Sequence, residues 1–167
     1  MAARKEDYMV YPIRPMTPED NAAMAALVRE NLKAHCLDIP GTAYFDESLD
    51  DLCSYYAEGN RGYFVMTDEE NRVVGGIGFA ECDLFPNCAE LQKLYLADRV
   101  KGRGLGNRLI AFVEENMRQN GYAAAYLETH HNLQAAMHLY EKWGYRQVPR
   151  PQGVIHSTMD HFFYKPL

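Results

Sequence analysis

The most informative stretch of this chain runs from residue 90 to residue 106 and reads ELQKLYLADRVKGRGLG. Its first part, Glu90 to Leu96, is rich in apolar and aromatic residues and is typical of a β-strand. Three glycines follow shortly afterwards, and an amphipathic pattern from about Leu105 to Gln119 predicts a helix directly behind them. The stretch therefore predicts a strand, a glycine-rich loop and a helix N-terminus in immediate succession.

This loop has the properties of an anion-binding site. Glycines allow positive φ, which lets successive backbone N–H groups point into one concavity, and a helix N-terminus adds about half a positive charge. Lys101, Arg103 and Arg108 add formal positive charge. No Gly-Lys-Ser/Thr follows as in a P-loop, and the dinucleotide fingerprint belongs to an early βαβ unit. We expect the loop to hold a phosphate group, and the alternative is a turn that is merely tight.

Apolar spacing and turn residues predict the other elements on both sides of this stretch. The predicted strands are Val10–Arg14 (closed by Pro15), Tyr63–Thr67, Val73–Ala80, Ala123–Glu128, Arg146–Val148 and His161–Lys165, and the predicted helices are Thr17 to about Cys36, Leu49–Ala57 and Leu133–Lys142. Asp68 to Asn71 is a predicted hairpin turn. No repeat or low-complexity linker divides the chain, so we expect one mixed α/β domain over residues 1–167, with a central sheet.

Two motifs resemble a known family. Lys101 to Gly106 is similar to the Arg/Gln-x-x-Gly-x-Gly/Ala loop of the GCN5-related N-acetyltransferase (GNAT) superfamily, with Lys in place of Arg or Gln. Residues 136–145, AMHLYEKWGY, resemble the family's Ala-x-x-x-Tyr-x-x-x-Gly-Phe/Tyr signature. Judged by element order as well, the resemblance extends from about Tyr11 to Leu167. It implies the acyl-CoA acyltransferase fold, a central, mostly antiparallel, twisted sheet flanked by helices.

The resemblance implies acetyl-CoA as co-substrate. The loop amides would hold its pyrophosphate, and the preceding strand would pair with its pantetheine arm as an extra strand. Many family members also carry Asn seven residues before the signature Tyr, where this chain has Leu133; Asn132, one residue further away, either contacts the coenzyme or only caps the helix. The expected coenzyme-binding residues are Leu94, Tyr95, Leu96, Lys101, Gly102, Arg103, Gly104, Leu105, Gly106 and Asn132.

The resemblance also suggests catalytic residues. In many members the signature Tyr, here Tyr140, protonates the departing sulfur; the alternative is a core aromatic on an amphipathic helix. Some members carry a glutamate that relays a proton through water, and Glu90 is the corresponding candidate here, unless it is a solvated carboxylate at a strand end. Glu128 and water alone are the other candidate bases. No histidine pairs with Cys or Ser at a recognisable nucleophile spacing, so we expect direct transfer without an acyl-enzyme. His130 and His131 either touch substrate or are solvated.

We expect the acceptor pocket between two loops, residues 39–46 and 149–158, which flank the cleft in the resembled fold. The predicted function is transfer of an acetyl group from acetyl-CoA to a primary amine of a small-molecule acceptor. Small amines, amino acids, polyamines and peptides all remain open as acceptors. A catalytically silent acyl-CoA-binding regulatory module is the alternative function.

Composition excludes several classes. The formal net charge is -6 without a basic run, which argues against a nucleic-acid partner. Four irregularly spaced cysteines form no CxxC pair, so we expect reduced cysteines and no metal. The start lacks the apolar core of a secretory signal, and no apolar run reaches the ~18 residues of a membrane span. We therefore expect a cytoplasmic protein with no membrane partner. Because homodimers are common in the resembled family, a homodimer is a further expectation.

Overall fold

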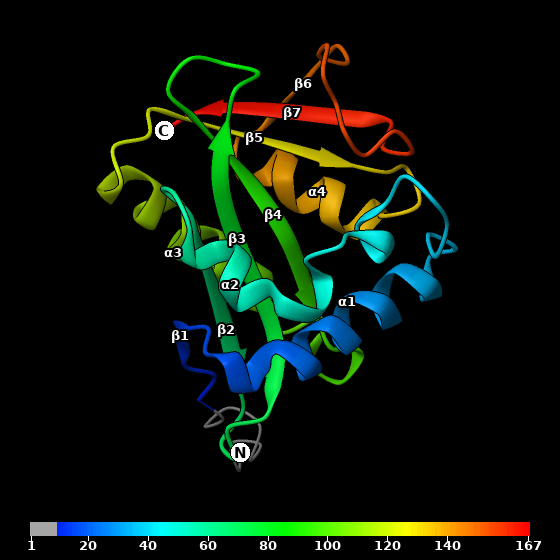
Figure 1. The fold of residues 1–167 in the computed structure, drawn as a ribbon, viewed down its shortest axis with the longest axis vertical. Coiled ribbons are helices and arrows are strands. Elements are labelled where there is room, and N and C mark those ends of the chain that lie inside the picture. Colours follow the sequence, from blue (N-terminus) through cyan, green and yellow to red (C-terminus); the bar gives the residue numbers. More distant parts are fainter. Residues whose placement is uncertain (1–9) are drawn as a thin grey trace, which may run out of the picture.

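The computed structural model describes residues 10–167, so the polar start of the chain, where no secretory signal was predicted, lies outside the described residues. Seven strands form one sheet in the order β1-β2-β3-β4-β5-β7-β6 (Figure 1). Their bounds are Ile13–Pro15 (β1), Gly62–Thr67 (β2), Val73–Cys82 (β3), Cys88–Leu96 (β4), Ala124–Thr129 (β5), Arg146–Val148 (β6) and His161–Pro166 (β7). Only β4 and β5 pair in parallel. The predicted mixed fold with a mostly antiparallel sheet is confirmed.

Helices cover both faces of this sheet (Figure 1). Their bounds are Asn21–Ala34 (α1), Leu52–Ala57 (α2), Leu105–Gln119 (α3) and Gln134–Lys142 (α4). Apolar side chains of α1 and α2 share one core with Tyr63 and Val65 of β2, and those of α3 and α4 share a second core on the other face. In α3 the buried residues Leu105, Leu109, Val113 and Met117 recur every four positions and so form one apolar stripe.

Several predicted boundaries differ from the structure. The first strand begins at Ile13 rather than at Val10, and Pro15 is its last residue, opposite Phe64 of β2. Because β1 is an edge strand, the missing N–H of proline costs no ladder hydrogen bond. The first two predicted helices each begin with a short 3₁₀ turn, Pro18–Asp20 and Leu49–Asp51, before α1 and α2 start. Strand β4 begins two residues earlier than predicted, at Cys88.

The feature that positions the site is a divergence of two neighbouring strands. β4 pairs with β5 only from Cys88 opposite Ala124 to Glu90 opposite Tyr126. Both strands continue beyond this point without further pairing to each other within the described chain, and they separate visibly in Figure 1. A register shift against β3 and a φ of +50° at Lys93 mark a bulge in β4. A wedge therefore opens between the two strands, next to the start of α3.

No helix within residues 10–167 combines the length and the apolar character needed to cross a membrane.

Candidate active site

The wedge contains a cavity of about 480 Å³. Its walls come from α1, β4, the glycine loop, α3, β5, α4 and the loop before β7. Most residues that the sequence singled out line it, namely Glu90, Leu94, Tyr95, Leu96, Lys101, Gly102, Gly104, Leu105, Gly106 and Tyr140. Arg103 and Asn132 are not among the lining residues. Tertiary structure thus brings the glycine loop, the end of β4 and the signature tyrosine to one cavity.

The glycine loop leads into α3 without a side-chain cap. Gly102 and Gly104 have φ values of +76° and +74°, and Gly104 is the N-cap of the helix. No side chain of the described residues caps α3, so its first N–H groups remain available to a ligand. At Gly106 a Cβ atom would lie 2.8 Å from Cδ2 of Leu139, so the glycine permits close packing of α3 on α4. The loop geometry fits an anionic group.

Of the three cations predicted near this loop, only Lys101 lines the cavity. Its ammonium group forms an ion pair with Asp98 at 2.7 Å and donates to Oδ1 of Asn31 at 3.1 Å. Arg103 is exposed, and the Arg108 guanidinium donates instead to the carbonyl of Tyr11 at 2.8 Å. The sequence prediction was therefore wrong for Arg108, because its position on α3 directs it toward the N-terminal segment.

Strand β4 holds Glu90 in the cavity wall through its neighbours. The hydroxyl of Tyr56 donates to Oε1 of Gln92 at 2.7 Å, and Nε2 of Gln92 donates to Oε2 of Glu90 at 3.1 Å. Burial, and then the nearby negative charge of Glu128, raises the pKa of Glu90 to about 7, although the Gln92 hydrogen bond opposes this shift. A carboxylate with a near-neutral pKa in a cavity is suited to general base catalysis.

Glu128, the second candidate base, lines the same cavity. Its Oε2 accepts a hydrogen bond from the Tyr126 hydroxyl at 2.8 Å, and burial raises its pKa. Both carboxylates therefore line one cavity.

Tyr140 lies on α4, is 6% exposed and lines the cavity. Within residues 10–167 its hydroxyl has no hydrogen-bond partner, and burial raises its pKa. The hydroxyl therefore keeps its proton at neutral pH and is free to donate it. Its ring also packs near Tyr145 and Phe163. The position of Tyr140 is therefore compatible with both a catalytic role and a role in the core.

Asn132 does not cap α4 as one alternative expected, because the N-cap is Leu133. A turn closed by the Leu133 N–H and the His130 carbonyl places Asn132 outside the helix. Its side-chain amide donates instead to the carbonyl of His35 at 2.9 Å. The residue that faces the cavity here is Leu133. Contact of Asn132 with the coenzyme remains a prediction.

Charged side chains join the two loops that were predicted to form the acceptor pocket, and no sequence pattern indicated their contacts. Lys93 is 6% exposed at its side chain and forms an ion pair with Oδ2 of Asp46 at 2.8 Å. The other oxygen of Asp46 lies 2.7 Å from Nε2 of His156, which is 110 residues away in the sequence. Nδ1 of His156 lies 3.9 Å from Oε1 of Glu128. Asp46 and His156 come from the two predicted acceptor loops, but no local pattern pairs them.

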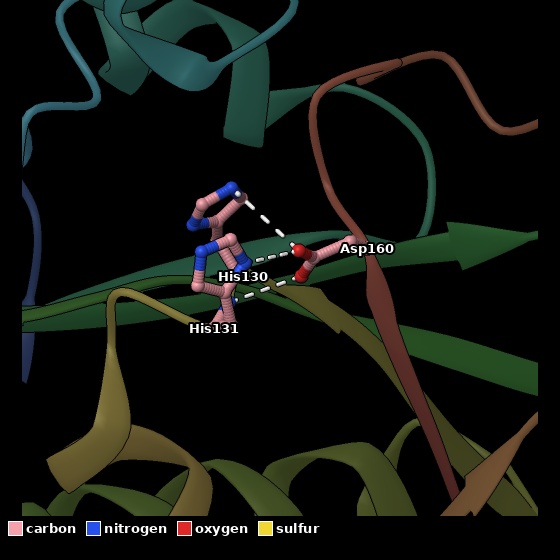
Figure 2. Close-up of side chains that lie close together, drawn as sticks. All are labelled: His130, His131 and Asp160. Atoms are coloured by element: carbon pink, nitrogen blue, oxygen red, sulfur yellow. Dashed lines mark hydrogen bonds and ion pairs between the residues drawn. The ribbon is translucent and has the colours of Figure 1, made fainter.

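Figure 2 shows a further polar cluster, formed by His130, His131 and Asp160. The Asp160 carboxylate accepts from the backbone N–H of His131 at 3.0 Å, contacts Nδ1 of the His131 ring, and lies 3.7 Å from Nε2 of His130. Nδ1 of His130 accepts from the Asn132 N–H at 3.1 Å, so Nε2 carries the proton and faces Asp160 as a donor. A histidine nitrogen that binds a metal must instead offer a lone pair to the ion, which a protonated Nε2 does not have. The cluster therefore ties the end of β5 to the start of β7, and neither histidine lines the cavity.

Comparison with known proteins is consistent with this geometry. The family model described as acetyltransferase (GNAT) family matches residues 26–145. The uncharacterized N-acetyltransferase YjgM of Escherichia coli (strain K12) is 33% identical over 147 residues, which cover 84% of this chain and 85% of that protein.

Two solved structures show the same fold. A GNAT-family acetyltransferase from Staphylococcus aureus Mu50 superposes with a TM-score of 0.84 at 16% identity, covering 95% of this chain and 99% of that one. The PaiA N-acetyltransferase of Thermoplasma acidophilum, solved in complex with coenzyme A, gives 0.73 at 18% identity, with coverage of 95% and 99%.

Proposed function

The chain belongs to the acetyltransferase (GNAT) family and is an N-acetyltransferase, and we propose that its substrates are acetyl-CoA and the primary amine of a small-molecule acceptor. The observation that carries this proposal is the common cavity of Glu90, Tyr140 and the glycine loop. A carboxylate with a near-neutral pKa and a protonated hydroxyl face one space, beside an uncapped helix N-terminus.

At the coenzyme end of the cavity, we expect backbone groups of the protein to bind the coenzyme. The N–H groups at the start of α3 would hold the pyrophosphate, with Lys101 adding positive charge. The segment Leu94 to Leu96, which β5 leaves unpaired, would pair with the pantetheine arm. This pairing would bring the thioester near the bulge in β4, between Glu90 and Tyr140.

The acceptor end supplies proton transfer. An alkyl amine with a pKa near ~10.4 costs roughly 4–5 kcal/mol to deprotonate at pH 7. Glu90 takes that proton, the nitrogen attacks the thioester carbonyl, and backbone N–H groups of Leu94 to Leu96 stabilise the developing oxyanion. As the carbon–sulfur bond breaks, Tyr140 donates its proton to the thiolate, whose own thiol pKa of ~8.5 makes it a tolerable leaving group. The nitrogen loses its second proton as the amide forms, and this proton returns through water to the Tyr140 phenolate. Transfer is direct, and no enzyme side chain is acetylated.

A screen of small amines, amino acids, polyamines and peptides with acetyl-CoA tests this proposal. We expect an acetylated product, identified by its mass, together with stoichiometric thiol release for at least one class of amine. Binding of acetyl-CoA without any acetylated product would contradict the proposal and favour the silent binding module. A peptide as the best acceptor would contradict the small-molecule assignment alone.

A further inference from the structure

Asp46 and His156 join the two acceptor loops beside the cavity. Their contact, 2.7 Å between Oδ1 and Nε2, leaves Nδ1 of His156 facing Glu128. The His156 side chain is 27% exposed, so it touches both the cavity wall and solvent. Among the cavity residues it is thus a titratable group that connects the carboxylates to the outside.

The Asp46 carboxylate fixes the state of the imidazole. It accepts a hydrogen bond from Nε2, so a neutral His156 carries its lone pair on Nδ1, the nitrogen directed at the cavity side. In hydrolases a carboxylate orients a histidine base through the same kind of hydrogen bond. Burial alone would raise the pKa of Asp46, but contacts with His156 and Lys93 lower it below its ordinary value. Asp46 therefore remains an anion that can support an imidazolium.

The charges around His156 favour proton acceptance. Asp46 from the turn after Phe45, Glu128 from β5 and Lys93 from β4 all face it, with Glu90 close behind on β4. The Asp46 hydrogen bond raises the pKa of His156, against the effects of burial and of the Lys93 charge. A proton held by Glu90 can therefore move to His156 at little cost in free energy.

We propose that His156 takes over the proton that Glu90 removes from the acceptor nitrogen and releases it to solvent. The inference rests on the proposed function. Glu90 loses its proton, directly or across one water, to Nδ1 of neutral His156 and returns to the carboxylate form. The imidazolium, held between Asp46 and Glu128, then gives its Nδ1 proton to a water molecule in the cavity, which exchanges with solvent. No electrons are exchanged, and one proton leaves per acetyl group transferred.

A structural role is the competing explanation, since His156 also links two loops. His156→Gln separates the two roles, because glutamine can donate to Asp46 but cannot titrate. His161→Gln is a matched control: Nδ1 of His161 lies 2.7 Å from Asp160, its side chain is 28% exposed, and it does not line the cavity.

The measurement is the pH dependence of kcat/KM with the best acceptor. We expect His156→Gln to lose about 10-fold or more at pH 7, with the KM for acetyl-CoA unchanged. In a plot of log kcat/KM against pH, the slope of the acidic limb should fall by about one, because the variant lacks His156, a group that must be deprotonated for activity. In His156→Ala, added imidazole should restore acetylated product, measured by mass. His161→Gln should stay within about twofold of wild type.

Other results of these experiments would contradict the proton relay through His156. A higher acceptor KM with an unchanged pH profile and no imidazole rescue would show that His156 only shapes the pocket. That outcome would overturn the relay and leave the acetyltransferase function intact. If wild type acetylates no amine, the proposed function and the relay fail together.

Discussion

The side-chain amide of Gln92 donates a hydrogen bond of 3.1 Å to the carboxylate of Glu90. The two residues are two apart on β4, so their side chains lie on the same face of the sheet. The hydroxyl of Tyr56, a buried residue of α2, donates to the carbonyl oxygen of the same Gln92 side chain. The contact orients Glu90 in the cavity and lowers its pKa against the effect of burial.

Gln92→Leu tests that contact. A hydrogen bond to the carboxylate favours its charged form, so loss of the donor should raise the pKa of Glu90 above about 7. The acidic limb of kcat/KM should move to higher pH, with activity about threefold or more below wild type at pH 6.5 and nearly equal at pH 8.5. Tyr56→Phe keeps the donor and should shift the limb less. An unmoved limb would show that Gln92 does not tune Glu90.

Glu90→Gln keeps the shape of the side chain and removes the base. Only the carboxylate accepts a proton, so wild-type activity should rise with pH through about 7, and this rise should be absent in the variant. We expect a loss of about 10²–10⁴ in kcat/KM near pH 7. The deficit should shrink as pH approaches the amine's own pKa, near ~10.

A pH–rate profile of both proteins, with Glu128→Gln beside them, measures this effect. A deficit that is constant across pH would assign Glu90 an electrostatic positioning role. Full activity in Glu90→Gln would pass the role of base to Glu128 or to water.

Gly104→Asp places a carboxylate at the N-cap of α3, where the phosphate should bind. We expect acetyl-CoA affinity to fall at least about 10-fold, or about 1.4 kcal/mol, by calorimetry. Gly121→Asp is the control, because Gly121 also has positive φ and open space where a Cβ atom would lie, but it is outside the cavity. Equal affinities for the two variants would refute binding at this loop.

Tyr140→Phe removes one hydroxyl from the cavity. Loss of a positioned acid should lower kcat by about 10²–10⁴, while the Kd for acetyl-CoA stays close to that of wild type. Tyr145→Phe removes a buried hydroxyl that has no hydrogen-bond partner among the described residues, and it should leave kcat unchanged. If Tyr140→Phe retains kcat within about twofold, Tyr140 is a packing residue.

Lys165→Met should lower the stability of the fold and leave the chemical step unchanged. The Lys165 ammonium lies 2.8 and 2.9 Å from the two oxygens of Glu114, whose side chain is 2% exposed. Removing the lysine leaves a buried carboxylate whose remaining ion pair within residues 10–167 is with Arg118, at 3.6 Å. We expect a loss of about 3 kcal/mol in the free energy of unfolding by urea. Arg29→Met, which breaks an exposed pair with Asp50, should cost less than about 1 kcal/mol.

Local sequence patterns determined the order of elements and much of the site. The helix from Leu105 to Gln119 was predicted with its observed bounds, because its apolar period and its flanking glycines are local signals. The glycine loop and Tyr140 were identified by motif, and the structure places both at one cavity. The start of the first strand, the N-cap of α4 and the direction of Arg108 were predicted wrongly, since strand pairing, turn geometry and the direction of a side chain depend on neighbours from elsewhere in the chain.

Tertiary structure alone decided the charge environment of the cavity around Glu90 and His156. The opening between β4 and β5 arises where their pairing stops after Glu90 and Tyr126, and no local periodicity encodes where two strands part. The near-neutral pKa of Glu90 comes from burial and from Glu128 on another strand. Asp46 meets His156 across 110 residues. A side chain's charge state depends on desolvation and on nearby charges, and both are set by which distant segments the fold packs together.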